Sequence, residues 1–204
     1  MKVKLNVPAT EKEIRRLKAG DEVYIEGTIY NVRQSLFKLV DMAEKGQRIP
    51  QSLLSGLKGG AIHYSGPLLD KKKERIMANS PIPVRNIPFS TIELVIKNLG
   101  IRIILAQDDW SEPQKMIQLL KNSGAVYLCT AIGCGAWYAY PKVKNIKNIY
   151  FQELGEMHAC YELEVENFGP TWVGIDAHGN SLLAETKKLL DENKRKMCQD
   201  RGWL

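Results

Sequence analysis

The spacing of apolar side chains predicts strands that alternate with helices through the middle of the chain. Apolar residues between Leu36 and Ala43 share one helical face, and Gly46 follows as a helix terminator. Short apolar runs at 101–106 and 125–129 are typical of buried strands, and each follows a glycine that would end a helix. Strands that alternate with helices favour an α/β layered domain.

The two ends of the chain carry further signals. The stretch Thr10-Glu11-Lys12-Glu13 fits a capping box, which would open a leading helix over residues 10–20. Polar and apolar residues alternate over 21–30, which predicts a strand, and Gly27 inside it predicts a bulge or a close approach of another backbone segment. Residues 181–204 are predicted to form a C-terminal helical tail.

Three other segments give less regular patterns. Glutamates alternate with apolar residues over 161–166, which predicts a strand with one solvent-facing side, and 171–176 reads as a separate strand. Four prolines within 67–90 exclude helix interiors and indicate an irregular loop. Ser90 and Ser111 are placed to cap the two helices that follow them.

Composition narrows the class of protein. The chain has 204 residues, 44% hydrophobic and 25% charged, which fits a single globular domain over 1–204. The net charge of +6 raises the option of a nucleic-acid partner. The lysines are scattered and no nucleic-acid motif accompanies them, so a solvated surface is favoured and no nucleic-acid partner is expected. We expect no membrane span and no signal peptide, and therefore a cytoplasmic location.

The cysteines do not suggest a metal site in this chain. Cys129, Cys134, Cys160 and Cys198 form no CxxC pair, whereas iron–sulfur and zinc sites use clustered thiolates. We expect no cofactor held by this chain alone, and reduced thiols that serve packing. Cys134 lies between two glycines, which leaves open a lowered thiol pKa, although packing in a tight turn is the favoured interpretation.

Several stretches together resemble one known family. They are residues 27–33, 64–67, 123–128, 153–155 and 164–168. In sequence they are similar to the β subunit, or C-terminal domain, of class I fumarate hydratases and L-tartrate dehydratases. The resemblance implies a swivelling β/β/α layered fold and a small hydroxy-carboxylate ligand. It also implies a hetero-oligomer in which a separate α-type hydro-lyase subunit holds an iron–sulfur cluster.

The resemblance also implies site residues, beginning with Arg33. An arginine at this position would bind a carboxylate through two parallel hydrogen bonds. Gln34 and Phe37 stand where the family has an aspartate and a histidine, so neither can titrate near neutral pH. A surface role for Arg33 at a helix start remains the alternative.

Two further family segments are altered. Ser80 opens the first of them, and Ile82 and Pro83 replace two threonines of which one is the family's base. Arg85 lies one residue earlier than the family's arginine. After the strand at 101–106, Gln107 replaces a lysine that would stabilise an anion.

Nearby acidic and basic residues leave alternatives open. Asp108 and Asp109 would either bind a cation or cap the following helix, and capping is favoured because acids stabilise helix N-termini. The retained segment 153–155 is followed by one extra residue, which would put His158 at the position of a family acid. A lone histidine is more often structural than catalytic.

Two classes of function fit these patterns. The first is a β-type subunit of an iron–sulfur hydro-lyase with an altered substrate. In it, Arg33 and Arg85 would bind carboxylate, and Gln34, Ser80 and Gln107 would donate hydrogen bonds. The second is a non-catalytic paralogue that binds a partner or small ligand through the same cleft, because fold does not fix function. No catalytic residue is assigned in either case.

Overall fold

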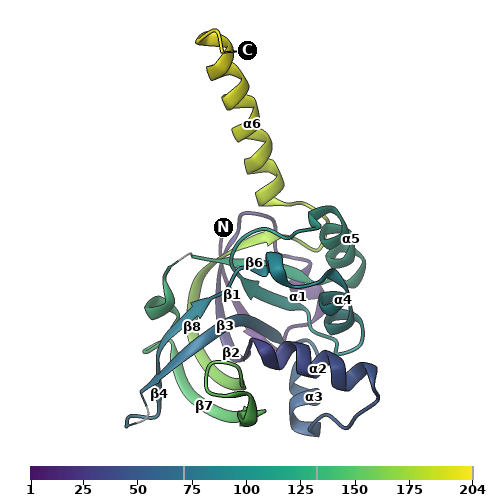
Figure 1. The fold of residues 1–204 in the computed structure, drawn as a ribbon, viewed down its shortest axis with the longest axis vertical. Coiled ribbons are helices and arrows are strands. Elements are labelled where there is room, and N and C mark those ends of the chain that lie inside the picture. The colour runs from purple at the N-terminus through teal and green to yellow at the C-terminus, as the bar shows by residue number, and fades with distance from the viewer. Residues whose placement is uncertain (71, 132, 204) are drawn as a thin grey trace.

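The computed structural model describes residues 1–70, 72–131 and 133–203 (Figure 1). The strands are β1 (Lys2–Val7), β2 (Glu22–Val32), β3 (Ala61–Asp70), β4 (Arg75–Pro81), β5 (Ile103–Ala106), β6 (Val126–Thr130), β7 (Val143–Tyr150) and β8 (Cys160–Ile175). The α-helices are α1 (Glu11–Ile14), α2 (Gln34–Glu44), α3 (Gln51–Leu57), α4 (Phe89–Lys97), α5 (Pro113–Ser123) and α6 (Leu182–Asp200). Three short 3₁₀ helices are η1 (Val84–Asn86), η2 (Gly135–Tyr138) and η3 (Gln152–Leu154).

The central sheet closes on itself. Its strands run in the order β1-β2-β3-β5-β6-β8-β7, and β2 also pairs with β8, so β2, β3, β5, β6 and β8 form a ring. The pairs β1–β2, β2–β3, β3–β5 and β5–β6 are parallel. Strand β8 runs antiparallel to β2, β6 and β7. The carboxyl ends of β2, β3, β5 and β6 therefore lie on the same rim of the ring.

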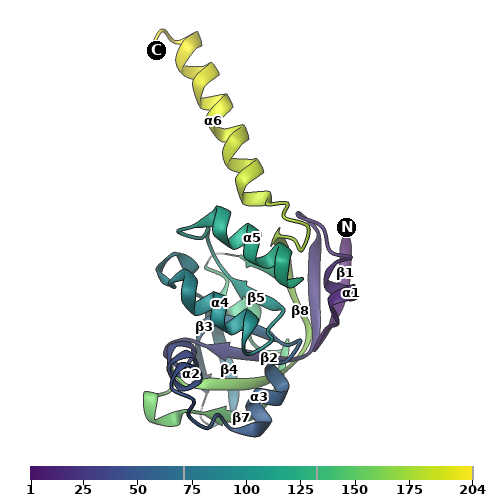
Figure 2. The same ribbon diagram turned by 90° about the vertical axis from the view of Figure 1, so that its right-hand side faces the viewer.

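Alternate residues of these strands fill two separate cores. Tyr30 and Val32 belong to a cluster shared with α2, α4 and α5, which cover one side of the sheet (Figures 1 and 2). Ile25 and Ile29 belong to a second cluster with Tyr138 and residues of β8. The mixed α/β architecture that the residue pattern predicted is confirmed, and it is consistent with a β/β/α layered fold.

Several predicted local signals lie where the sequence put them. Thr10 and Glu13 form the capping box, in which the Glu13 amide donates to Thr10 Oγ1 and the Glu13 carboxylate accepts from the Thr10 amide. Helix α1 ends after one turn, earlier than predicted. The Leu17 amide bonds to the Ile14 carbonyl oxygen three residues back, and the Lys18 amide donates to Asp21 Oδ2. Gly27 has φ +109°, and a Cβ there would lie 2.3 Å from the Val7 carbonyl oxygen. The predicted bulge is confirmed by the register shift between Ile25 and Gly27.

The prediction of an irregular loop over 67–90 was wrong. Strand β3 continues to Asp70, and β4 pairs with it antiparallel, with Gly66 opposite Ser80. Prolines exclude helix interiors but are tolerated in edge strands, and β4 pairs with β3 alone among the described strands. The proline count therefore could not distinguish a loop from an edge hairpin.

Two predicted helix caps were also wrong. Helix α4 begins at Phe89 after Pro88, and α5 begins at Pro113 after Glu112, and neither start has a side-chain cap among the described residues. Pro113 is at the start of α5, where its fixed φ favours the first turn of a helix, and Pro88 is the residue that precedes α4. Helix α5 does end as predicted, with Gly124 in the left-handed conformation at φ +60°.

Strand β8 unites two strands that the sequence pattern separated. It runs without a break from Cys160 to Ile175. Glu162, predicted to face solvent, is buried and accepts hydrogen bonds from Asn148 Nδ2 at 2.8 Å and Tyr150 Oη at 2.9 Å. Polar side chains on β7 donate the hydrogen bonds that the buried carboxylate needs. The alternation of glutamates and apolar residues in β8 carried no information about these partners.

Helix α6 extends away from the rest of the protein (Figures 1 and 2). Ser181 caps its start by accepting a hydrogen bond from the Ala184 amide at 3.2 Å. None of its described residues is buried, and Leu189 and Leu190 are exposed. In the described part of the chain, no helix is both long and apolar enough to cross a membrane.

Candidate functional site

The candidate residues gather at the rim formed by the carboxyl ends of the parallel strands. Arg33 directly follows β2, and Gln107 directly follows β5. Gly66 lies where β3 extends past the rim, and Ser80 faces it from β4. In open α/β sheets and in closed α/β barrels alike, ligands bind beside the carboxyl ends of the parallel strands, and the location is consistent with that rule.

Arg33 lies against the β3–β4 hairpin. A Cβ on Gly66 would lie 3.3 Å from Arg33 Nη1, so the absence of a side chain at Gly66 lets the guanidinium approach the backbone. Because Gly66 is opposite Ser80, Arg33 is adjacent to the strand pair that carries the Ser80 hydroxyl. Within residues 1–70, 72–131 and 133–203, no protein acceptor binds the Arg33 guanidinium. Its hydrogen-bond donors are therefore available to an anion.

The neighbouring tyrosine stays protonated. Burial raises the pKa of the Tyr64 phenol above its ordinary value, and the positive charge of Arg33 offsets part of that increase. A neutral phenol beside Arg33 leaves the guanidinium charge uncompensated from that side. Tyr64 belongs to the stretch 64–67 that carries the family resemblance, but its role beside Arg33 follows only from the fold.

The segment after β7 packs over the connection between β2 and α2. The Ser35 amide donates to the His158 carbonyl oxygen at 3.0 Å, and Glu153 forms an ion pair with Lys38 on α2. A Cβ on Gly66 would also lie 3.4 Å from Met157 Cε. The retained segment 153–155 thus belongs to the wall beside Arg33. His158 Nδ1 is buried without a partner among the described residues.

Ser80 is packed against the glycine-rich turn. A Cβ on Gly135 would lie 2.2 Å from Ser80 Oγ, so only glycine leaves room for the serine in this position. Gly135 begins η2, whose Tyr138 is buried in the second core. The fold therefore brings together two segments that are separated by 55 residues in the sequence.

Gln107 joins the hairpin to β5 through its backbone. The Val84 amide donates to the Gln107 carbonyl oxygen at 3.2 Å, and the Gln107 amide donates to the Ile82 carbonyl oxygen at 3.4 Å. The altered positions Ile82 and Pro83 therefore lie directly beside Gln107, with Pro83 opposite it in a parallel bridge. Ile82 and Pro83 present no hydroxyl group there.

The other candidate residues are placed less favourably for a ligand. Arg85 is exposed on η1 and forms an ion pair with Asp108, which neutralises its charge. Gln34 is exposed at the first position of α2. Neither Asp108 nor Asp109 caps α5 as predicted, since Asp108 pairs with Arg85 and Asp109 Oδ1 accepts from the Trp110 amide at 2.8 Å. Of the five candidates, the structure brings Arg33, Ser80 and Gln107 to the hairpin base.

Behind Arg33 and Ser80 lie buried polar side chains that sequence reasoning did not assign to the site. They are Asn31, His63, Ser65 and Asn79, all less than 2% exposed. The available signal was a polar residue within an otherwise apolar strand, as His63 is within 61–65. That signal gives no partner, because the partners come from three different strands.

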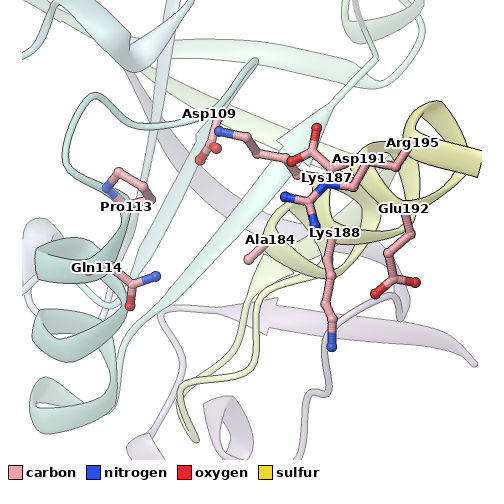
Figure 3. Close-up of a pocket in the computed structure, with 9 residues that line it drawn as sticks. All are labelled: Asp109, Pro113, Gln114, Ala184, Lys187, Lys188, Asp191, Glu192 and Arg195. Atoms are coloured by element: carbon pink, nitrogen blue, oxygen red, sulfur yellow. The ribbon is translucent and has the colours of Figure 1, made fainter. Parts of the chain in front are cut away.

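A separate groove of about 460 Å³ lies between α6 and the start of α5 (Figure 3). Its lining contains three cationic and three anionic side chains: Lys187, Lys188, Arg195, Asp109, Asp191 and Glu192. These charges balance, so the groove offers no net attraction to an anion. None of the five candidate residues lines it.

The described residues of this chain do not fit a metal cluster. No group of three or more His, Cys, Asp or Glu side chains among them is arranged to hold a metal ion. Burial raises the pKa of the Cys129 thiol to about 12, and burial also raises the pKa of Cys160. Protonated thiols are poor metal ligands, because the thiolate is the form that binds.

Comparisons with known proteins find one family along most of the chain. A model of the family described as Fumarase C-terminus matches residues 1–186. A putative L(+)-tartrate dehydratase subunit beta of Methanocaldococcus jannaschii is 33% identical over 186 residues, covering 90% of this chain and 92% of the relative. The L(+)-tartrate dehydratase subunit beta of Escherichia coli strain K12 is 27% identical over 202 residues, covering 98% of this chain and 96% of the relative. A putative fumarate hydratase class I of Geobacillus stearothermophilus is 31% identical, and the match spans 34% of that longer protein.

Proposed function

Because the chain belongs to the fumarase C-terminus family, we propose that it is a β-type subunit of an iron–sulfur hydro-lyase that acts on a small hydroxy-carboxylate. The observation that carries this proposal is the Arg33 guanidinium, which lies against Gly66 with no protein acceptor among the described residues. A free guanidinium against the strand pair that carries a hydroxyl, on a strand-end rim, supports binding of a carboxylate.

The chain's own residues supply binding and orientation. Arg33 would donate two parallel hydrogen bonds to one carboxylate, and Ser80 Oγ would donate to a second oxygen of the ligand. Gly66 and Gly135 leave the space that both side chains need. Gln34 and Gln107 would add neutral hydrogen bonds at the edges of the site, whereas the ion pair with Asp108 would keep Arg85 from binding the ligand.

The reaction needs more than this chain offers. Dehydration breaks a C–O bond and removes a proton from the neighbouring carbon, so a proton acceptor must lie beside the substrate. Ile82, Pro83 and Gln107 cannot accept a proton at neutral pH. We assign the metal cluster, which would bind the departing hydroxyl, to an α-type partner subunit in a hetero-oligomer. The reduced thiols fit a cytoplasmic location for this assembly.

The altered residues favour a substrate other than fumarate. Ile82 and Pro83 put apolar surface where the family has two hydroxyl groups, and Gln107 replaces a positive charge with a neutral amide.

A second candidate function rests on the same substitutions. Five positions implied by the family resemblance are replaced, namely Gln34, Phe37, Ile82, Pro83 and Gln107. A paralogue that binds a carboxylate or a partner without catalysis would retain Arg33 and lose these groups. The two candidates differ in whether the assembled protein turns over a substrate.

The deciding experiment is reconstitution with an α-type subunit encoded beside this chain. We expect the two chains to co-purify anaerobically with iron and sulfide on the α-type subunit, and to release water from L-tartrate or a related hydroxy-acid. The matched control is the same assembly carrying Arg33→Ala. Co-purification without turnover of any hydroxy-carboxylate tested would favour the non-catalytic paralogue, and failure to associate would contradict the β-subunit proposal.

A further inference from the structure

Four buried polar side chains form a connected network inside the closed sheet. Asn31 Nδ2 donates to Asn79 Oδ1 at 2.5 Å, and Asn79 Nδ2 donates back to Asn31 Oδ1 at 3.3 Å. Ser65 Oγ donates to Asn79 Oδ1 at 2.8 Å, and His63 Nδ1 lies 3.2 Å from Asn31 Oδ1. The four residues come from β2, β3 and β4, so side-chain bonds join three strands at one point.

Each strand in this network carries a residue of the candidate site close by. Asn31 is on β2 and precedes Arg33, the residue that follows this strand, by two positions. Ser65 is next to Gly66, which the Arg33 guanidinium approaches, and Asn79 is next to Ser80. A shift of any one strand along its neighbour would therefore change the distance between the Arg33 guanidinium and the Ser80 hydroxyl.

The hydrogen-bond pattern fixes the form of His63. Asn31 Oδ1 is an amide oxygen and can only accept, so His63 Nδ1 is the donor and carries the ring proton. His63 Nε2 is then a bare acceptor, buried without a partner among the described residues. Its ring lies edge-on to Tyr138 and Phe168, at centroid distances of 6.1 Å and 5.5 Å.

An apolar side chain at position 63 would avoid that unsatisfied nitrogen. Retaining a polar network in a core costs stability unless its bonds are all made, whereas directional bonds define a single register. Strand β4 particularly needs such a constraint. It is an edge strand, and its register with β3 shifts between Leu68 and Leu69.

We propose that the network of Asn31, His63, Ser65 and Asn79 is a positioning device that holds the Arg33 guanidinium and the Ser80 hydroxyl in register for one carboxylate. This inference rests on the proposed function for the identity of the ligand. The four residues act through Arg33 and Ser80 and do not touch the ligand themselves.

The test compares two identical substitutions in the full-length chain. Ser65→Ala removes the bond to Asn79, whereas Ser181→Ala removes the capping bond to the Ala184 amide at the start of α6. Both serines are buried, with 1% and 7% exposure, so each variant loses one buried hydroxyl. Ser65→Cys, whose thiol is a weak donor, replaces Ser65→Ala if the latter does not fold.

Two readouts are measured on each variant. The first is the ¹H–¹⁵N spectrum without ligand, in which Ser65→Ala should move the amide signals of Gly66 and Ser80 and the Arg33 Nε–H signal. Ser181→Ala should leave all three in place. The second is L-tartrate affinity by calorimetry, which should fall on the order of tenfold in Ser65→Ala and remain unchanged in Ser181→Ala.

The outcomes separate this inference from the proposed function. If the three signals are unchanged in Ser65→Ala, as they should be in Ser181→Ala, the positioning role is wrong, whatever the L-tartrate affinity of the variant. If the signals move but Arg33→Ala binds L-tartrate as well as the unmodified chain does, the network positions Arg33 and the ligand proposal is wrong. If the signals move and Arg33→Ala weakens binding while Ser65→Ala does not, positioning for the carboxylate is also wrong.

Discussion

The side chains of Asn31 and Asn79 face each other inside the closed sheet and exchange two hydrogen bonds, of 2.5 Å and 3.3 Å. Both residues are fully buried, and they are separated by 48 positions in the sequence. Their contact fixes β4 relative to β2 although the two strands are not neighbours in the sheet. The position of the site residues that follow them depends on this pair.

The two arginines of the site should behave differently on removal. Arg33→Ala should weaken binding of L-tartrate by about 1.5–3 kcal/mol, because a charge-assisted bidentate contact is lost. Arg85→Ala is the matched control and should change affinity little, because Asp108 already neutralises that exposed arginine. Calorimetry on both variants checks this, and equal losses would show that Arg85 leaves Asp108 to bind the ligand.

Glycine at position 135 should matter through Ser80. In Gly135→Ala the new Cβ would lie 2.2 Å from Ser80 Oγ, so Ser80 must move, at a cost of about 1–3 kcal/mol in the free energy of unfolding. Gly133→Ala is the control: its Cβ meets nothing within 4 Å, and its strain comes only from a φ of +73°. We expect weaker L-tartrate binding in Gly135→Ala alone. Urea titration first establishes that both variants are folded. Equal L-tartrate affinities of the two folded variants would then show that Ser80 does not contact the ligand.

His63 should make the protein sensitive to acid. Burial lowers its pKa to about 3, below the value near 6.5 expected for the unfolded chain. Above pH ~6.5 both states are neutral; below it only the unfolded state binds the proton, so stability falls as pH decreases. The slope should reach about 1.4 kcal/mol per pH unit between pH ~6 and ~4.

Urea unfolding from pH 7.5 to 5 of the unmodified chain and of His63→Gln measures that slope. Glutamine can donate to Asn31 Oδ1 but does not titrate, so the variant should lose the His63 part of the slope while other groups keep theirs. Parallel curves for the two proteins would mean that His63 is protonated in the folded state as readily as in the unfolded state.

Truncation before Glu185 should leave the domain folded. The removed part of α6 has no buried residue among those described, so we expect the free energy of unfolding to change by less than about 0.5 kcal/mol and Tm by less than ~2 °C. Circular dichroism should lose helical signal while the thermal transition is retained. A large drop in Tm would place α6 against the domain in solution.

Activity on fumarate should be low. Assembled with a competent α-type subunit, the chain should hydrate fumarate far more slowly than a family member that retains the threonines and the lysine, because Ile82, Pro83 and Gln107 cannot transfer a proton. A steady-state assay at the fumarate absorbance, run beside such a family member, measures this. Full activity would point to another proton-transfer group, such as His158 in the wall beside Arg33.

Local patterns in the sequence were sufficient to predict where most of the parallel strands and the helices around them lie. The period of the apolar residues in 36–43, 101–106 and 125–129 reports which face is buried, and that face is a property of each segment alone. The family resemblance also placed Arg33 at a strand end. Where the patterns were misleading, as for Glu162 and the hairpin of β3 and β4, the deciding partner lay on another strand.

The sequence by itself determined the class of fold, the family, and which polar residues had replaced the family's reactive groups, since each is legible from residue type and order. Only the tertiary structure decided that the Arg33 guanidinium lies against Gly66 with no acceptor among the described residues, and that Asp108 forms an ion pair with Arg85. The structure also decided that the missing side chain of Gly135 leaves room for Ser80. The physical reason is that a charge or hydroxyl has its effect through whatever lies within a few ångströms of it. In this chain those neighbours come from strands and turns 23 to 55 residues away, which only the folding of the whole chain brings together.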